Sequence, residues 1–273
     1  KGINTYNKFL IPAYPSMVCF SMHHAINVGL DKTARKYNIK SQIENNPNTH
    51  YYLFSKEDIS FFQDYYGIKV NQKVIGIPRH NHKWMRQVID RQDQLSNKYH
   101  SKPFLLVIGR PPSDFLPLDR KEKTLRDIKR LAIGKLDLNV VIKCHPKEKN
   151  FDIYEKVFGK EQYNQKWFYS KRHPYILAEK CKLCVNFYSS LVLDFIVLGT
   201  PVIEYLNLKG IEFHDNEDSY RDEFKNPVFD YRYFGLALGA DNFEDLENQS
   251  HKILSDKDLV LNQLTENYKD IFY

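Results

Sequence analysis

The sequence has 273 residues, of which 42% are hydrophobic and 27% are charged, and its formal net charge is +6. This composition excludes an intrinsically disordered chain, and the length allows one large domain or two smaller ones, of which we favour two. Basic residues are spread along the chain, which argues against nucleic acid as a partner and suits an anionic small substrate or an anionic membrane surface equally well. The longest apolar run, residues 191–198, is interrupted by Asp194, so no membrane-spanning helix is predicted.

Strand and helix patterns alternate along the first hundred residues. Apolar runs with β-branched and aromatic members predict strands at residues 14–22, 51–54 and 74–77. Helical spacing predicts helices at residues 26–37 and 56–66. Ser55, with Asp58 three residues later, predicts the N-cap of the second helix. Residues 83–99 form a polar helical stretch that we interpret as a connector, and we place the domain boundary between residues 99 and 100.

A second series of elements begins at residue 104. Runs that are apolar throughout predict strands at residues 104–108, 139–143, 167–169, 183–187 and 201–205. Helices are predicted around residues 125–132, at 174–179, at 191–198 and in the tail at 243–272. Strands of this kind, alternating with helices, predict a parallel sheet covered on both faces. Residues 100–240 therefore read as a doubly wound α/β domain, whose ligands bind outside the carboxyl ends of its strands.

Four cysteines occur in the chain: Cys19, Cys144, Cys181 and Cys184. A chain of this length needs no disulfide scaffold, so reduced thiols in a cytosolic setting are expected. Cys181 and Cys184 have the C-x-x-C spacing of a redox or zinc site, but a second metal-ligand pair at suitable spacing is missing and the surroundings predict a buried strand. Structural thiols are therefore favoured over a metal or redox site.

Polar residues follow two of the predicted strands at their carboxyl ends. Gly109 lets a ligand approach the backbone and Arg110 can pair with phosphate, although a simple turn before the next prolines explains Gly109 equally well. Lys143 and His145 end the next strand, where His145 can donate to a phosphate while Pro146 fixes the turn that aims it. A surface loop that happens to contain a histidine is the alternative for His145.

Ser189 and Ser190 lie between a predicted strand and the helix at residues 191–198, with Ser190 as the predicted N-cap and Gly199 as the helix stop. This arrangement leaves free backbone N–H groups and the positive end of a helix dipole at the strand's carboxyl end, as in phosphate sites. Capping alone explains one serine but not two adjacent ones, so anion binding is favoured. Convergence of three strand ends on one edge of the sheet is better evidence than any single motif.

Two adjacent histidines, His23 and His24, follow the first predicted strand. A histidine near its ordinary pKa is a natural general base for deprotonating an acceptor hydroxyl. Adjacent residues on a strand point to opposite faces, so a shared metal ion is not expected and at most one of the pair acts. Residues 76–80 end another strand, where they either line the same cleft or form a solvated loop.

Two segments of the C-terminal half resemble a known family. They are Lys-Cys-His-Pro-Lys-Glu at residues 143–148 and the Ser-Ser motif at residues 189–203, which contains Asp194, Gly199 and Pro201. Both resemble the C-terminal half of GT-B glycosyltransferases that use CMP-activated donors, such as bacterial polysialyltransferases, capsule Kdo transferases and CDP-glycerol glycerophosphotransferases. The resemblance implies that His145, Ser189 and Ser190 contact the donor phosphate.

The N-terminal half carries shorter matches. Residues 23–25 resemble the His-Gly turn of these families, with Ala25 where glycine is usual, and residues 74–79 resemble their Gly-x-Pro-Arg segment. We expect His24 rather than His23 to act as the general base. This half is short for a complete Rossmann-like domain, so one or two βα units are expected to precede Lys1 or to be missing.

The resemblance implies an α/β, GT-B-like fold of two Rossmann-like domains whose parallel sheets face a cleft, with a short or truncated N-terminal domain. Residues 1–99 would form the acceptor-side domain, and residues 100–273 the nucleotide-donor domain with C-terminal helices. Two catalytic residues are expected, His24 and His145. The expected nucleotide-binding residues are Gly109, Arg110, Lys143, His145, Pro146, Ser189, Ser190 and Asp194.

The expected reaction moves a sugar such as sialic acid or Kdo, or a polyol phosphate, from a cytidine-nucleotide donor to a surface-polysaccharide acceptor. CMP and UDP donors are poorly separated by sequence, because base recognition often uses backbone contacts. The resemblance implies a site that needs no metal or other cofactor, since in a GT-B site helix N-termini and basic or neutral donors stabilise the departing nucleotide phosphate. Expected partners are the nucleotide-sugar donor and a glycan or glycolipid acceptor, in the cytoplasm or at the inner face of the membrane in capsule polysaccharide biosynthesis.

Two rival interpretations share this pattern. UDP-N-acetylglucosamine 2-epimerases have the same sheet and the same Ser-Ser and Gly-x-Pro pattern, but they would need carboxylates in the cleft for proton abstraction, and the N-terminal half offers few at strand ends. The other is a non-catalytic interaction protein on an old transferase scaffold. The presence of His24, His145 and both serines argues against it.

Overall fold

The computed structural model describes residues 18–22, 28, 49–67, 71–93, 102–148 and 151–273. It divides the chain into two compact units, Lys1–Asn81 with Lys269–Tyr273, and His82–Tyr268. His23, His24 and most of the helix predicted at residues 26–37 lie outside the described residues. So does the predicted domain boundary between residues 99 and 100, which stays a prediction.

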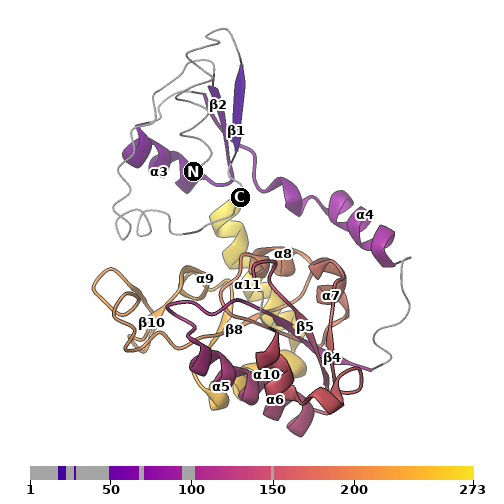
Figure 1. The fold of residues 1–273 in the computed structure, drawn as a ribbon. Coiled ribbons are helices and arrows are strands. Elements are labelled where there is room, and N and C mark those ends of the chain that lie inside the picture. Colours follow the sequence, from indigo (N-terminus) through magenta and orange to yellow (C-terminus); the bar gives the residue numbers. More distant parts are fainter. Residues whose placement is uncertain (1–17, 23–27, 29–48, 68–70, 94–101, 149–150) are drawn as a thin grey trace. The chain divides into compact units, whose positions relative to one another are not determined.

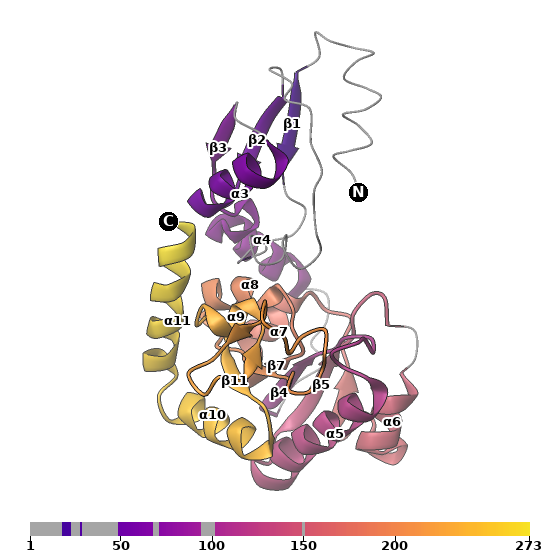
Figure 2. The same cartoon turned by 90° about the vertical axis from the view of Figure 1, so that its left-hand side faces the viewer.

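The described part of the first unit contains a parallel sheet in the order β1-β2-β3 (Figure 2). Its elements are β1 (Cys19–Met22), β2 (Thr49–Leu53), α3 (Lys56–Tyr66) and β3 (Gln72–Val74). The predicted capping box of Ser55 and Asp58 begins α3. The strand predicted at residues 74–77 is displaced, because Gly76 has φ +69° and Pro78 begins a short 3₁₀ turn (Pro78–His80).

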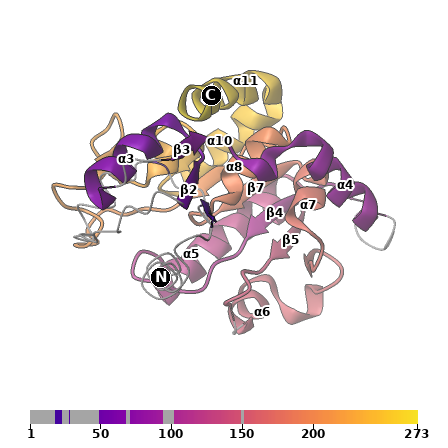
Figure 3. The same cartoon turned by 90° about the horizontal axis from the view of Figure 1, so that it is seen from above.

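The second unit is built on six parallel strands in the order β11-β8-β7-β4-β5-β6. Figure 3 shows β7, β4 and β5 side by side at its centre. The strands are β4 (Phe104–Ile108), β5 (Asn139–Lys143), β6 (Trp167–Tyr169), β7 (Leu183–Asn186), β8 (Ile203–Tyr205) and β11 (Leu238–Ala240). This is the doubly wound order 3-2-1-4-5-6 of Rossmann folds, in which β4 is the first strand. All five residues of β4 are buried, as its continuous apolar run predicts.

Helices cover both faces of this sheet, with α5, α6 and α10 on one face and α7 and α8 on the other (Figures 1 and 2). The helices are α5 (Leu118–Lys129, continued by a π-helix at Arg130–Lys135), α6 (Asp152–Phe158), α7 (Pro174–Lys180), α8 (Leu191–Val197), α9 (Asp230–Tyr233), α10 (Phe243–Ser255) and α11 (Lys257–Phe272). A 3₁₀ turn (Lys160–Gln162) and a hairpin of β9 (Tyr220–Arg221) and β10 (Pro227–Val228) complete the unit. None of the described helices is long and apolar enough to cross a bilayer.

Two stretches differ from their predicted form. The predicted connector contains α4 (His82–Asp93), whose Met85 and Ile89 pack against Tyr175 and Ile176 of α7. An apolar stripe among its polar residues is enough to dock it there. The predicted single helical tail is two helices, because Asp256 leaves the helical conformation and its carboxylate caps the next helix through the Leu259 N–H.

Candidate functional site

The winding of the six-stranded sheet reverses between the neighbouring strands β4 and β7. Ile108, the last residue of β4, pairs in register with Lys143 on β5 and with Asn186 on β7. The loops that follow these three strands therefore leave the sheet at one edge. They carry the sequence-predicted residues Gly109, Arg110, His145, Pro146, Ser189 and Ser190. In doubly wound sheets, ligands bind outside this edge, at the point where the winding reverses.

Arg110 joins the loop after β4 to the loop after β7. Its Nη1 donates a hydrogen bond of 2.6 Å to the backbone carbonyl of Tyr188. Its guanidinium also lies over the Phe115 ring, 4.7 Å from the centroid. Burial lowers the pKa of Arg110, but a guanidinium keeps its charge at neutral pH. The switch point therefore holds a fixed positive charge with further N–H donors.

Tyr188 makes the turn between β7 and α8 in a left-handed backbone conformation, with φ +64°. A residue other than glycine pays about 1–3 kcal/mol of strain in such a region. Packing holds it there, since its ring stacks on Phe229 with centroids 4.0 Å apart. The turn determines where Ser189 and Ser190 leave the sheet.

The two serines have different roles in the turn. The Ser189 hydroxyl accepts a hydrogen bond of 3.4 Å from the Leu191 backbone N–H, so it partly caps α8. Ser190, the predicted N-cap, precedes the helix but makes no side-chain capping bond. The reason is its helical backbone conformation (φ −61°, ψ −10°), whereas a capping residue is usually extended. Among the described residues the Ser190 hydroxyl has no hydrogen-bond partner, which leaves it available to a ligand.

His145 is held in one tautomer by the turn that follows β5. The Lys147 backbone N–H donates to Nδ1 over 3.0 Å, so the proton of the neutral ring is on Nε2. Exposed Pro146 lies in this turn, which the Glu148 N–H closes on the His145 carbonyl at 2.9 Å. Burial lowers the pKa of His145, and the charges of Arg110 and Lys147 add to this effect. At neutral pH the ring is therefore a neutral Nε2–H donor.

A buried polar cluster supports the loops of Arg110 and His145 from below. The Lys121 amine of α5 donates to the Arg110 carbonyl over 2.8 Å and forms an ion pair with Glu148, both side chains being 1% exposed. The Tyr154 hydroxyl donates to the same carboxylate over 2.9 Å. Gly109 is required above the cluster, since a Cβ there would lie 2.6 Å from the Tyr154 oxygen. One ion pair thus fixes the spacing of two loops.

Sequence reasoning missed this cluster, although a signal for it is present. Lys121 stands four residues before Leu125 and seven before Ile128, on the apolar face of α5. A lysine on such a face needs a buried partner. Glu148 lies within the motif at residues 143–148 that carries the resemblance, but its burial could not be read from the sequence.

Lys143, His173 and Asp194 lie near the same edge but are more deeply placed. Burial lowers the pKa of Lys143 and of His173, and the charge of Lys143 adds to the effect on His173. His173, which sequence reasoning also missed, accepts a hydrogen bond from the Tyr175 N–H at its Nδ1 over 3.3 Å. Asp194 is 1% exposed and accepts from the Tyr175 hydroxyl over 3.0 Å. A nucleotide-binding role for Asp194 stays a prediction.

The C-x-x-C pair lies inside the second unit. Burial raises the pKa of the Cys181 thiol to about 12 and raises that of Cys184 as well. Such thiols are poor nucleophiles and poor metal ligands at neutral pH. In the part of the chain that the structure describes, no group of three His, Cys, Asp or Glu side chains is arranged to hold a metal ion.

Comparisons with known proteins identify solved structures of similar fold. No protein-family model and no curated protein matches the sequence. The S. aureus MnaA–UDP complex matches 97% of this chain and 74% of its own with a TM-score of 0.57 at 15% identity. A putative UDP-N-acetylglucosamine 2-epimerase from Listeria monocytogenes matches 97% of this chain and 72% of its own, with a TM-score of 0.55 at 11% identity.

The wall teichoic acid polymerase TagF also matches, with a TM-score of 0.50 and 15% identity over 92% of this chain. This chain spans 59% of the TagF chain. At these identities the matches establish the fold alone, and the predicted α/β, GT-B-like fold class is confirmed. Activity and substrates have to be argued from the residues.

Proposed function

We propose that the second unit binds the phosphate of a nucleotide donor at its switch point, and that the chain is a glycosyltransferase. The observation that carries the proposal is the convergence of Arg110, Lys143, His145 and Ser190 on the edge where the winding reverses. They supply positive charge, a neutral N–H donor and a hydroxyl to which none of the described residues is hydrogen-bonded. Phosphate oxygens are acceptors that such groups recognise.

The reaction that suits these groups is transfer from a cytidine-nucleotide donor, such as a CMP-activated sugar or a CDP-polyol, to a surface glycan or glycolipid. When the donor bond breaks, negative charge develops on the departing phosphate. His145 Nε2–H and the Arg110 guanidinium, already fixed by other bonds, would stabilise that charge without rearrangement. Protein donors can perform this role without a metal ion.

The acceptor hydroxyl has to lose a proton during transfer. His24 is the proposed general base, on the ground of its sequence context alone, since it lies outside the described residues. The acceptor class and a location in the cytoplasm, at the inner face of the membrane, are proposed on the same ground. Substitution of His24, with His23 as its control, tests this part separately.

A second candidate is an epimerase acting on UDP-N-acetylglucosamine. It is favoured by the two structures with TM-scores of 0.57 and 0.55, one a UDP complex and the other named as a putative epimerase of this kind. The two activities differ in what they need. An epimerase converts its nucleotide sugar without any acceptor, whereas a transferase releases the nucleotide efficiently only when an acceptor hydroxyl is present.

The first experiment is a thermal-shift series with CMP, CDP, UMP, UDP and GDP. A nucleotide at 100 times its dissociation constant adds about 2.7 kcal/mol to stability. We expect a shift with the cytidine nucleotides that Ser190→Ala reduces. A shift with uridine nucleotides alone, followed by acceptor-independent conversion of UDP-N-acetylglucosamine, would establish the epimerase. No shift with any nucleotide would refute a nucleotide site and favour the non-catalytic interpretation.

A further inference from the structure

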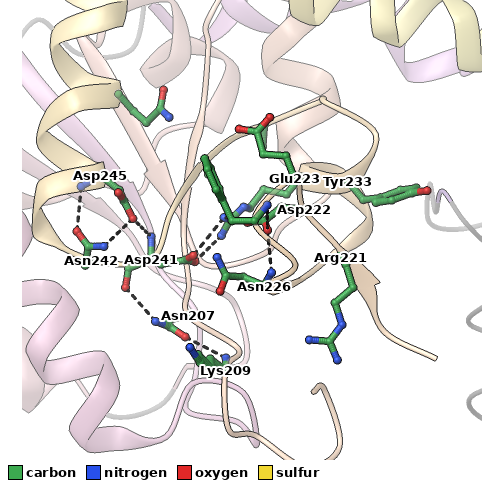
Figure 4. Close-up of a pocket in the computed structure, with 15 residues that line it drawn as sticks. Asn207, Lys209, Arg221, Asp222, Glu223, Asn226, Tyr233, Asp241, Asn242 and Asp245 are labelled. Carbon is green, nitrogen blue, oxygen red and sulfur yellow. Dashed lines mark hydrogen bonds and ion pairs between the residues drawn. The ribbon is translucent and has the colours of Figure 1, made fainter. Parts of the chain in front are cut away.

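A cavity of about 830 Å³ opens beside the carboxyl ends of β8 and β11, away from the residues proposed to bind phosphate (Figure 4). Its walls come from the loop after β8, the β9–β10 hairpin, α9 and the start of α10. The volume lies within the ~300–1,000 Å³ of small-molecule sites. The cavity belongs entirely to the second unit.

The floor of the cavity is a closed ion-pair network around Arg232, whose side chain is 10% exposed. Its Nη1 donates to Asp241 over 2.6 Å and its Nη2 donates to Asp222 over 3.3 Å. Gly239 makes room for this guanidinium, because a Cβ at that position would clash with it. The charge of Arg232 is therefore already matched, and the floor offers no unpaired cation to a phosphate.

The rim of the cavity carries unused hydrogen-bonding groups. Among the described residues, no side-chain hydrogen bond is made by Lys209, Glu223, Asn226, Tyr233 or Gln249. Two of these side chains are amides and one is a hydroxyl, so each both donates and accepts. The single positive and single negative charge balance. A ligand that matches this rim is uncharged and presents many groups that donate and accept hydrogen bonds.

Two aromatic residues also line the cavity. Phe224 is 76% exposed and Tyr233 is 50% exposed. Tyr233 is also fixed, since its ring stacks on Tyr220 with centroids 4.4 Å apart. A rigid aromatic ring offers an apolar face at low entropic cost. Sugar rings combine an apolar C–H face with a rim of hydroxyl groups, which is the pattern that this cavity complements.

A smaller cavity of about 360 Å³ lies next to the large one. It shares Asn207, Lys209 and Asp241 with the larger cavity and reaches Phe115. Arg110 lies over the ring of Phe115. The two cavities thus share part of their lining, and the smaller one also includes Phe115, the residue that Arg110 contacts.

We propose that the cavity above Arg232 binds a neutral oligosaccharide. A nucleotide or another anion would need an excess of positive charge, whereas the lining carries three cations and four carboxylates: Lys209, Arg221 and Arg232 against Asp222, Glu223, Asp241 and Asp245. The carboxylates of the cavity do not form a metal-holding group among the described residues. That the bound saccharide is the acceptor rests on the proposed function, whereas saccharide binding itself does not.

The test uses maltotetraose and tetra-N-acetylchitotetraose as neutral probes and a sialic acid tetramer as the anionic one. Saturation-transfer NMR detects binding to the full chain, and titration calorimetry measures affinity. We expect at least one neutral probe to bind and Tyr233→Ala to weaken that binding about tenfold. Asn226→Ala, which removes one rim amide without touching the aromatic stack, should weaken it as well. The control is Phe213→Ala, an aromatic residue that is 43% exposed and outside the cavity.

Three outcomes overturn the inference: no neutral probe binds, binding is unaffected by Tyr233→Ala and Asn226→Ala, or only the anionic probe binds in a Tyr233-dependent way. CMP binding, measured in the same variants, separates this result from the proposed function. Retained CMP binding without saccharide binding overturns the inference alone. Saccharide binding without any nucleotide binding supports the inference and overturns the proposed function.

Discussion

The Arg110 guanidinium donates a 2.6 Å hydrogen bond to the Tyr188 carbonyl and so bridges the two loops that border the switch point. Tyr188 in turn holds a left-handed backbone conformation that its stacking on Phe229 maintains. The Arg110–Tyr188 hydrogen bond therefore links the charge at the proposed phosphate site to the turn that leads to the serines. A change in Arg110 alters both.

Arg110→Lys is therefore expected to weaken nucleotide binding although it keeps the charge. A lysine has no planar fork, so it cannot bond the Tyr188 carbonyl and a phosphate together in the same way. Loss of one charge-assisted hydrogen bond corresponds to about 1.5–3 kcal/mol, or roughly tenfold to a hundredfold in affinity. Calorimetry with CMP measures this loss of affinity. Arg120→Lys, which also removes an arginine bond to a loop carbonyl, that of Asn207, is the control and should bind normally.

The adjacent serines should respond differently to alanine. Ser190→Ala removes a hydroxyl that has no hydrogen-bond partner in the part of the chain that the structure describes, so it should lower nucleotide affinity and leave stability nearly unchanged. Ser189→Ala removes the acceptor of the Leu191 N–H and should lower the free energy of unfolding by about 1 kcal/mol. Denaturant titration and calorimetry on both variants give the comparison. The reverse pattern would mean that Ser190 has a structural role that its conformation does not suggest.

His145→Ala should reduce turnover by ~10²–10³-fold, the usual effect of losing one donor to developing charge. His145→Gln should restore part of this loss, since its amide N–H can occupy the position of Nε2–H. Because burial and the nearby cations lower the pKa of His145, the wild-type ring stays neutral through the physiological range. His251→Ala, at an exposed position of α10, is the control. Activity within a few fold of wild type in His145→Ala would leave His145 as an ordinary loop residue.

The Lys121–Glu148 pair should behave as a buried ion pair whose single substitutions cost more than the double one. Lys121→Met leaves the Glu148 carboxylate buried without its cation, which typically costs ~3–5 kcal/mol. Lys121→Met with Glu148→Gln removes both charges and should recover much of that loss. Denaturant unfolding of the four forms yields the coupling energy. Simple additivity would show that the two side chains do not stabilise one another.

Glu204 predicts a pH dependence of stability. It pairs in register with Asn186, and Glu204 Oε2 and Asn186 Oδ1 are buried oxygens without a partner among the described residues. Burial raises the pKa of Glu204 to about 8, above ~4.3 in an unfolded chain, so the folded state keeps a proton that the unfolded state releases. The stability that this bound proton contributes is complete below the unfolded-state pKa of ~4.3. It is lost as the pH rises to about 8, and over this range the free energy of unfolding falls by at most ~1.4 kcal/mol per pH unit.

Glu204→Gln cannot ionise. Its free energy of unfolding should therefore not decline between the unfolded-state and folded-state pKa values of Glu204. Denaturation at a series of pH values compares it with wild type. Glu212→Gln on an exposed side chain is the control and should follow wild type. Parallel curves for wild type and Glu204→Gln would show that Glu204 titrates normally.

The sequence predicts well those strands whose residues form a continuous buried, apolar run. β4, β5 and β6 begin and end at the predicted residues, because each is an apolar run bounded by polar or turn-forming residues. β11 was missed, since Leu238-Gly239-Ala240 is short and contains a glycine, which is unusual in a strand. That glycine makes room for the Arg232 guanidinium. α6 was missed although α7 and α8, of the same length, were predicted: α7 begins at a proline and α8 follows two serines, whereas Phe151 before α6 gives no capping signal.

The candidate site shows the same limit. Strand ends can be located from sequence, so the meeting of Gly109, Lys143 and Ser190 at one edge was predictable from a parallel sheet. Which serine caps α8 was not, because that depends on backbone angles imposed by Tyr188. The ion pair of Lys121 with Glu148 joins residues 27 positions apart, and only the packed structure brings them together.

Gly109 lies where the packed structure leaves no free space for a side chain. The space that a side chain would occupy is already filled by the Tyr154 hydroxyl, the Glu148 carboxylate and the Cys144 backbone. Even an alanine has to push apart the loops that follow β4 and β5. It would do so without removing any charged group. In a survey of all single variants, position 109 should therefore stand out as permitting only the wild-type residue, whereas exposed neighbours such as Pro112 accept many.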